Sequence, residues 1–343
     1  MKRTGFLLLI VLIAGCSGKK NIPDVSNIAI KLDVVRFEKD FFAMDTTHLD
    51  ASLETLFHQY PGFAKDFFYR VMGANANPDT AMKEVRQFIR MYKTVYDSSA
   101  KIFADFNPVE KEIKKGLRFV KYYFPSYKLP EKLFTFVGPV DAVFKTANGV
   151  SGDVITRDGL GIGLQLHLGK DFSLYQTGSV QQLYPSFVSR KFEAPYIPVN
   201  CIKNIIDDIY PDNSSGRPLV EQMIESGKRL YMLDALLPET ADSIKTGYTQ
   251  KQLDDCYHNE TAIWSYFAQN DLLYSEDPSQ TGMYMNDGPG TPELGTAAPG
   301  FIGQFVGWQI VKKWMSKNEK KTLDELMKMP AKQLFEEAKY KPR

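Results

Sequence analysis

The sequence has little of the residue types that mark several well-known chemistries. It contains four histidines and three cysteines among 343 residues. None of them forms an HExxH pair or a CxxC pair, so the usual zinc spacings are missing. A GxSxG elbow is also missing, which removes support for a serine hydrolase of that type. The glycines at 159–163 lie in strand-like sequence and lack the loop-to-helix context of a phosphate-binding loop.

An excess of charge of one sign is missing too. The chain has 42 basic and 41 acidic side chains, and loss of Lys2 and Arg3 with residues 1–15 would leave 40 against 41. This balance argues against nucleic acid, which rewards a concentrated basic face. After residue 14 no second run of 18 apolar residues occurs, so we expect no transmembrane helix there.

The first residues have the features of an export signal. Lys2 and Arg3 give a positive start, and residues 6–14 form an unbroken apolar run. This run is too short to span a bilayer as a mature helix, but it fits the apolar region of a signal peptide. The 328 residues that would remain after cleavage suit one large domain or two fused ones.

The four residues at the end of this signal, Ile13-Ala14-Gly15-Cys16, resemble the lipobox read by bacterial lipoprotein signal peptidase. The resemblance implies cleavage before Cys16 and attachment of acyl chains such as palmitate, two or three of which anchor stably. The alternative is an ordinary secretory signal with an incidental cysteine. Serine, not aspartate, comes directly after Cys16, and no acidic run lies next to it. This pattern resembles sorting to the outer membrane, on its periplasmic face.

Hydrophobic periodicity predicts an α+β fold that is mainly helical around a small central mixed sheet near residues 133–168. We expect a signal peptide (1–15), a lipidated tether (16–27) and a single domain (28–343), with a mainly helical part (28–130) and a part with sheet and helices (131–343). Strands are predicted at 28–37, 134–138, 154–156 and 160–168. Helices are predicted at 41–57, 81–106, 109–124, 199–209, 218–237, 249–267, 301–315 and 323–328, and a long irregular loop at 275–300.

Two pairs of residues bear on packing and redox chemistry. Gly303 and Gly307 have the GxxxG spacing, which predicts close contact between two helices of a soluble domain. Cys201 and Cys256 could form a disulfide in an oxidising compartment. The alternative is two buried free thiols, and the sequence leaves both open.

Four polar residues in the last third are candidates for a cleft or binding site. Glu221 and Glu225 lie four residues apart, so both carboxylates share one face of a helix and could do acid/base work or bind a cation. The alternative is a solvated face paired with nearby Lys228 and Arg229. His258 and Glu260 are candidates on the next helix, and the alternative there is a hydrogen-bonded polar pair of the core.

Several of these segments together resemble the GldB family of gliding-motility lipoproteins. The resemblance implies an outer-membrane lipoprotein with protein partners in gliding or other envelope machinery, and no nucleic acid. The segments run from the lipobox almost to the end of the chain: residues 13–16, 31–42, 135–138, 160–171, 219–238, 247–249 and 302–311.

The same segments are distantly similar to a group of zinc peptidases, in which an HExxH helix follows the sheet. Residues 199–209 take the place of that helix without any histidine, and Glu225 takes the place of a third ligand. One glutamate cannot hold zinc without nitrogen partners. We therefore expect a zincin-like fold reused for binding, with no catalytic residue, metal or cofactor. The alternative is a metal-dependent hydrolase with an atypical site made of Glu225, Glu260 and His258.

Overall fold

The computed structural model describes residues 22–147, 149–295 and 297–342. The expected signal peptide (Ile13, Ala14 and Gly15 included) and the expected lipidation site Cys16 lie outside the described residues. Within the described ranges, no helix combines the length and apolar character needed to cross a bilayer.

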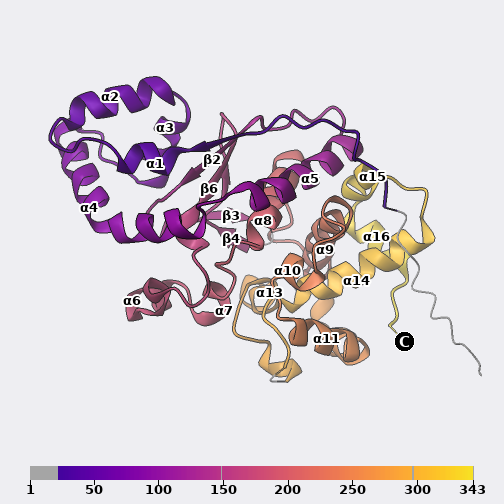
Figure 1. Cartoon of the computed structure of the whole chain (residues 1–343). Helices are drawn as coiled ribbons and strands as arrows, with labels where there is room; N and C mark the ends of the chain where they lie inside the picture. The colour runs from indigo at the N-terminus through magenta and orange to yellow at the C-terminus, as the bar shows by residue number, and fades with distance from the viewer. Residues whose placement is uncertain (1–21, 148, 296, 343) are drawn as a thin grey trace, which may run out of the picture.

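A four-stranded mixed sheet lies at the centre of the molecule (Figure 1). Its order is β1 (Asp33–Arg36), β2 (Lys132–Phe136), β6 (Leu160–Gly163) and β5 (Val154–Ile155). The first three strands are parallel and β5 is antiparallel to β6. A separate hairpin, β3 (Phe144–Thr146) with β4 (Gly149–Ser151), precedes β5. The predicted small mixed sheet is thus confirmed.

Helices between β1 and β2 form the parallel crossover and cover one end of the sheet. Figure 1 shows the first four of them gathered on the left of the view, while the last, α5 (Asn107–Tyr123), runs toward the right. Phenylalanines make the contact, since the Phe63 and Phe134 rings stack with centroids 4.1 Å apart and Phe37 meets Phe67 edge-on at 4.9 Å. The elements are α1 (Phe37–Phe42), α2 (Leu49–Gln59), α3 (Phe63–Asp66), a π-helical turn (Phe67–Val71), α4 (Pro78–Ile102) and α5 (Asn107–Tyr123).

The other half is built on two helices in very close contact, α9 (Leu219–Leu236) and α14 (Ile302–Lys317). A Cβ on Gly307 would lie 1.6 Å from the Met223 carbonyl oxygen, and a Cβ on Gly227 would lie 2.1 Å from the Gly307 carbonyl carbon. Only glycine allows two backbones to approach this closely. The close helix contact predicted from Gly303 and Gly307 is confirmed, and α14 is buried along most of its length.

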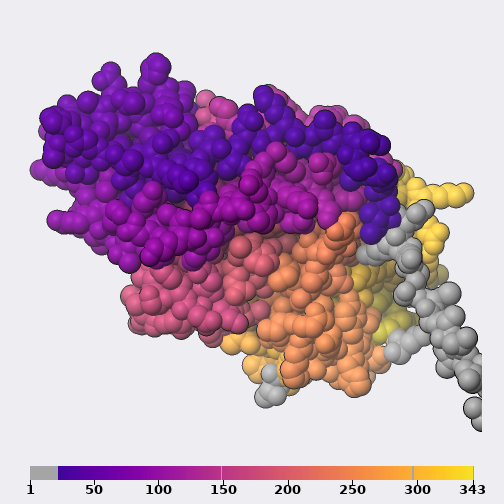
Figure 2. Space-filling model, in the orientation of Figure 1, coloured from indigo at the N-terminus to yellow at the C-terminus, as the bar shows by residue number. Residues whose placement is uncertain are grey.

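Helix α8 (Tyr196–Ile209) lies between the sheet and this helix pair. Figure 2 shows the N-terminal part of the chain running across the top of the molecule, above the C-terminal half. The remaining α-helices are α6 (Gly178–Leu183), α7 (Ser186–Ser189), α10 (Asp242–Thr246), α11 (Gln250–His258), α12 (Glu260–Gln269), α13 (Pro278–Met285), α15 (Leu323–Lys328) and α16 (Ala331–Ala338); short 3-10 turns occur at Leu164–Leu166, Ser173–Gln176, Leu272–Tyr274 and Pro292–Leu294.

Three predicted elements are shorter than expected because local hydrogen bonds or a missing partner end them. The helix predicted at 41–57 is split, since the Asp45 side chain accepts from the Thr47 backbone and forms a turn. The strand predicted at 28–37 is present only as Asp33–Arg36. It begins late because its partner β2 starts after Pro130, which has no N–H for the ladder. The strand predicted at 160–168 ends at Gly163 and continues as a 3-10 turn.

The C-terminal third differs from the prediction in three places. The capping box of Thr249 and Gln252 is present, but the helix predicted at 249–267 breaks at Asn259, whose side chain bonds the Asp255 carbonyl. The loop predicted at 275–300 contains α13, which Asp277 caps by accepting from the Ser279 backbone. Helix α16 follows the last helix predicted.

Candidate functional site

A cavity of about 490 Å³ lies where the two halves of the molecule meet. Its walls come from the hairpin β3–β4, helix α8, the segment 183–196, the turn between α10 and α11, and the loop after α13. A volume of this size is typical of sites for small molecules or short chain segments. Because its walls come from segments far apart in the sequence, the cavity exists only in the folded chain.

Asp153 and His167 form a buried pair at the wall of this cavity. Asp153 lies just before β5, and His167 follows the turn after β6; they are 1% and 3% exposed. The His167 Nε2 atom lies 3.0 Å from both carboxylate oxygens. Because a carboxylate only accepts, Nε2 carries the proton and donates. The other ring nitrogen, Nδ1, is buried and has no hydrogen-bond partner in the part of the chain that the structure describes.

Two further donors complete the surroundings of the Asp153 carboxylate. The Asn200 amide on α8 donates to Oδ2 at 2.8 Å, and the Gly163 backbone donates to Oδ1 at 3.2 Å. Asn204, one turn along the helix, donates to the Asp153 carbonyl at 3.2 Å. The carboxylate is therefore enclosed by donors from three elements, and this arrangement fixes how α8 packs against the sheet.

The polar face of α8 is the place that the resemblance to zinc peptidases assigns to an HExxH helix. Its side chains there are the amides of Asn200 and Asn204, and the thiol of Cys201 is 1% exposed. Burial raises the pKa of the Cys201 thiol well above its ordinary value, so the group is held as an unreactive thiol. Cys256 is buried as well, and both cysteines are free, so the disulfide alternative is wrong.

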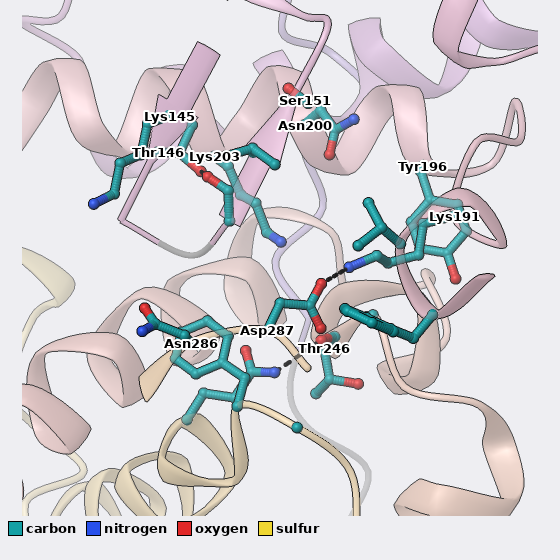
Figure 3. A pocket seen from close by; sticks show the side chains of 18 of the residues that line it. Lys145, Thr146, Ser151, Lys191, Tyr196, Asn200, Lys203, Thr246, Asn286 and Asp287 are labelled. Atoms are coloured by element: carbon teal, nitrogen blue, oxygen red, sulfur yellow. Dashed lines mark hydrogen bonds and ion pairs between the residues drawn. The ribbon is translucent and has the colours of Figure 1, made fainter. Parts of the chain in front are cut away.

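Charged side chains meet at the centre of the cavity. Figure 3 shows Lys203 pointing into it from α8 and Asp287 facing it from the loop after α13, with Lys191 paired to Asp287. Burial is the main cause that lowers the pKa of Lys203 to about 8, and the charge of Lys191 adds to it. The nearby Asp287 carboxylate raises this pKa again in part. An ammonium group withdrawn from water in this way gains from any additional anion.

The four residues expected at a cleft lie elsewhere. Glu225 forms an ion pair with Lys228 at 2.7 Å and lies 3.7 Å from Arg229. Glu260 accepts from the Tyr340 hydroxyl at 2.5 Å, while His258 is exposed at the end of α11. Like half-buried Glu221, they are absent from the walls of the cavity among the described residues.

The alternative metal set of Glu225, Glu260 and His258 is therefore not brought together. Over the described ranges, no group of three or more histidine, cysteine, aspartate or glutamate side chains is arranged to hold a metal ion. Glu225, Glu260 and His258 are engaged with different partners or with solvent, because the helices that carry them present other faces to the core. The ion pairs of Glu225 match the alternative of a helix face paired with Lys228 and Arg229.

The residues that do meet at the cavity left only a faint trace in the sequence. In an otherwise apolar helix, Asn200, Lys203 and Asn204 recur at intervals of three and four, which places them on one face. His167 stands alone in the sequence, and nothing in the spacing connects it to Asp153. A polar stripe on an apolar helix was thus the one available signal.

Comparison with known protein families matches residues 18–342 to the family described as gliding motility protein GldB. The match spans nearly the whole chain and includes the sheet, the helix pair and the cavity. Searches of curated proteins and of solved structures found no match, so a zincin-like architecture stays a prediction. The chain belongs to the GldB family of gliding-motility proteins.

Proposed function

We propose that the chain is an outer-membrane lipoprotein on the periplasmic face, anchored through Cys16, that acts as a non-enzymatic component of gliding or related envelope machinery. Family membership supports the link to gliding. The lipobox at residues 13–16 supports the anchor. In this proposal the cavity beside α8 is where the lipoprotein binds a partner or ligand.

The observation that carries the binding role is the chemistry of the Asp153 site. The carboxylate is engaged by His167, Asn200 and the Gly163 backbone. Hydrolytic use of an Asp–His pair needs a nucleophile within hydrogen-bond reach of the second ring nitrogen. Among the described residues no hydroxyl or thiol bonds to the His167 ring. The pair thus supports a positioning role in the wall of a binding cavity.

Gene deletion in the native host tests this proposal. We expect deletion to impair colony spreading or to change the envelope proteome, and expression of the wild-type chain to restore both. Cys16→Ala should abolish acylation and outer-membrane recovery and should fail to restore function at equal abundance. A deletion strain with normal spreading and an unchanged envelope proteome would contradict the motility role. Full restoration by Cys16→Ala would contradict the anchor.

Metal content separates the binding role from the hydrolase alternative. We expect the mature lipoprotein, purified in detergent without chelators, to contain far less than one zinc per chain. About one zinc per chain, lost on substitution Glu225→Ala, would contradict the non-enzymatic proposal. The matched control is Glu221→Ala, one turn earlier on the same helix.

A further inference from the structure

The cavity carries an unbalanced positive charge. Among the described residues that line it, four side chains are basic and two are carboxylates, those of Asp212 and Asp287. Asp207 of α8 lies outside the lining and also acts on Lys203, but it is paired with Arg229. Asp212 also lies 3.9 Å from Arg229, a residue that does not line the cavity. Part of the Asp212 charge is therefore already engaged. A concave, cationic site attracts anions and raises their local concentration. The basic residues are Lys145, Arg190, Lys191 and Lys203.

Asp287 shows how a carboxylate can be held there. Its side chain reaches into the cavity, pairs with Lys191 and lies close enough to Lys203 to raise the pKa of that ammonium group. Asp287 comes from the loop after α13, whereas the two lysines come from the segment before α8 and from α8 itself. A protein carboxylate therefore already occupies an anion position between two separate elements, and a ligand carboxylate would use the same chemistry.

The rest of the wall suits a peptide. Asn286 and Gln252 offer amide groups, while Phe187 and Tyr196 offer apolar surface. Such mixed walls match a backbone with its side chains.

We propose that this cavity binds a peptide segment through a carboxylate group, which joins or displaces Asp287 at Lys191 and Lys203. The proposal rests on the binding function inferred above and names its ligand class. The carboxylate can come from a free C-terminus or from an acidic side chain. Both sources present the same group to the lysines, so the experiment has to distinguish them.

The test uses the mature lipoprotein in detergent and three pools of random acetylated tetrapeptides, with retained peptides measured by mass spectrometry. One pool has free C-termini, one is amidated without acidic residues, and one is amidated with a single glutamate. We expect at least tenfold more retention of a carboxylate-bearing pool than of the neutral pool. The pool that is retained identifies the source. Equal retention of all three pools, or none, would overturn the proposal.

Variants connect the binding to these residues. Lys203→Met removes the charge but keeps an unbranched side chain, and it should lower retention at least tenfold, while Lys170→Met, at an exposed lysine outside the cavity lining, should leave it unchanged. Unchanged retention by Lys203→Met would overturn the site.

Asp287→Asn removes the internal competitor and should increase retention several-fold, a gain that misfolding cannot produce. Retention lowered by Asp287→Asn in a protein with a wild-type melting curve would also contradict the proposal. Loss of peptide binding in a protein that still restores spreading would reject this ligand class and leave the envelope role standing.

Discussion

Asp153 accepts three side-chain or backbone hydrogen bonds at a place where water cannot replace them. Its partners His167 and Asn200 come from the end of the sheet and from α8. Removal of a buried acceptor leaves its donors unsatisfied, and that cost exceeds the value of the bonds themselves. Asp153 therefore links stability to the shape of the cavity wall.

We expect Asp153→Ala to lower the free energy of unfolding by about 3 kcal/mol. The measurement is urea unfolding followed by circular dichroism. Asp171→Ala, at an exposed carboxylate, is the control and should change stability by less than about 0.5 kcal/mol. A loss below about 1 kcal/mol for Asp153→Ala would show that the network is not a structural anchor.

Lys203 makes the free energy of unfolding depend on pH. The sign of this dependence is opposite to that of a lysine in a stabilising ion pair. Burial lowers its pKa in the folded chain to about 8, below the ordinary lysine value of 10.5. Between these two values the unfolded chain binds more protons, so stability rises with pH there. The charged ammonium group therefore lowers the stability of the folded chain at neutral pH.

We therefore predict that wild-type protein gains stability relative to Lys203→Met between pH 7 and pH 10, on the order of 1–3 kcal/mol. Urea midpoints measured at both pH values for both proteins test this. The difference between the two proteins cancels the titration of tyrosines. A gain of the same size in both proteins would mean that Lys203 is ordinarily solvated.

At the scale of elements, α9 and α14 are in very close contact. A Cβ at Gly307 would overlap the Met223 carbonyl, and backbone atoms cannot move aside without separating the helices. We predict that Gly307→Ala lowers the free energy of unfolding by about 3 kcal/mol or more, or prevents folding.

Gly178→Ala is the matched control for this prediction. Gly178 begins α6, and a Cβ there would meet nothing within 4 Å. Alanine should leave stability unchanged or raise it slightly. Thermal unfolding of both variants decides the matter, and equal melting temperatures would contradict the close packing of the helix pair.

Local signals in the sequence were enough for some elements and not for others. The spacing of Gly303 and Gly307 predicted a close helix contact, and Thr249 with Gln252 predicted a capping box, because each depends on neighbours along the chain. The break at Asn259 and the early end of the strand at Gly163 depend on packing against distant segments. Periodicity carries no information about such contacts.

The candidate site could not be predicted from the sequence, because it also depends on contacts between distant segments. His167, Lys203 and Asp287 lie on three segments that only the folded chain brings to one cavity, and Asp153, which bonds His167, lies on a further segment. The carboxylates of Glu221 and Glu225 were candidates for a site because they are close in sequence. Glu225, however, contacts Lys228 and Arg229 on its own helix. The spacing of two residues along a helix shows that they share a face, but it does not show which residues that face contacts.

At the scale of the whole molecule, an anchor on Cys16 would hold the described domain near the bilayer. Five residues lie between Cys16 and Ile22, where the described chain begins. Such a segment spans at most about 20 Å when fully extended. The cavity would then act on partners that come to the periplasmic surface of the outer membrane, and it would not act on distant ones.

We propose that the lipid-anchored chain works through its cavity. A complementation experiment tests this proposal directly. A deletion strain receives the wild-type chain, Lys203→Met or Lys170→Met at the native locus, and colony spreading and the envelope proteome are measured at equal outer-membrane abundance. We predict that Lys170→Met restores colony spreading and the envelope proteome, and that Lys203→Met restores neither. Full restoration by Lys203→Met would contradict it.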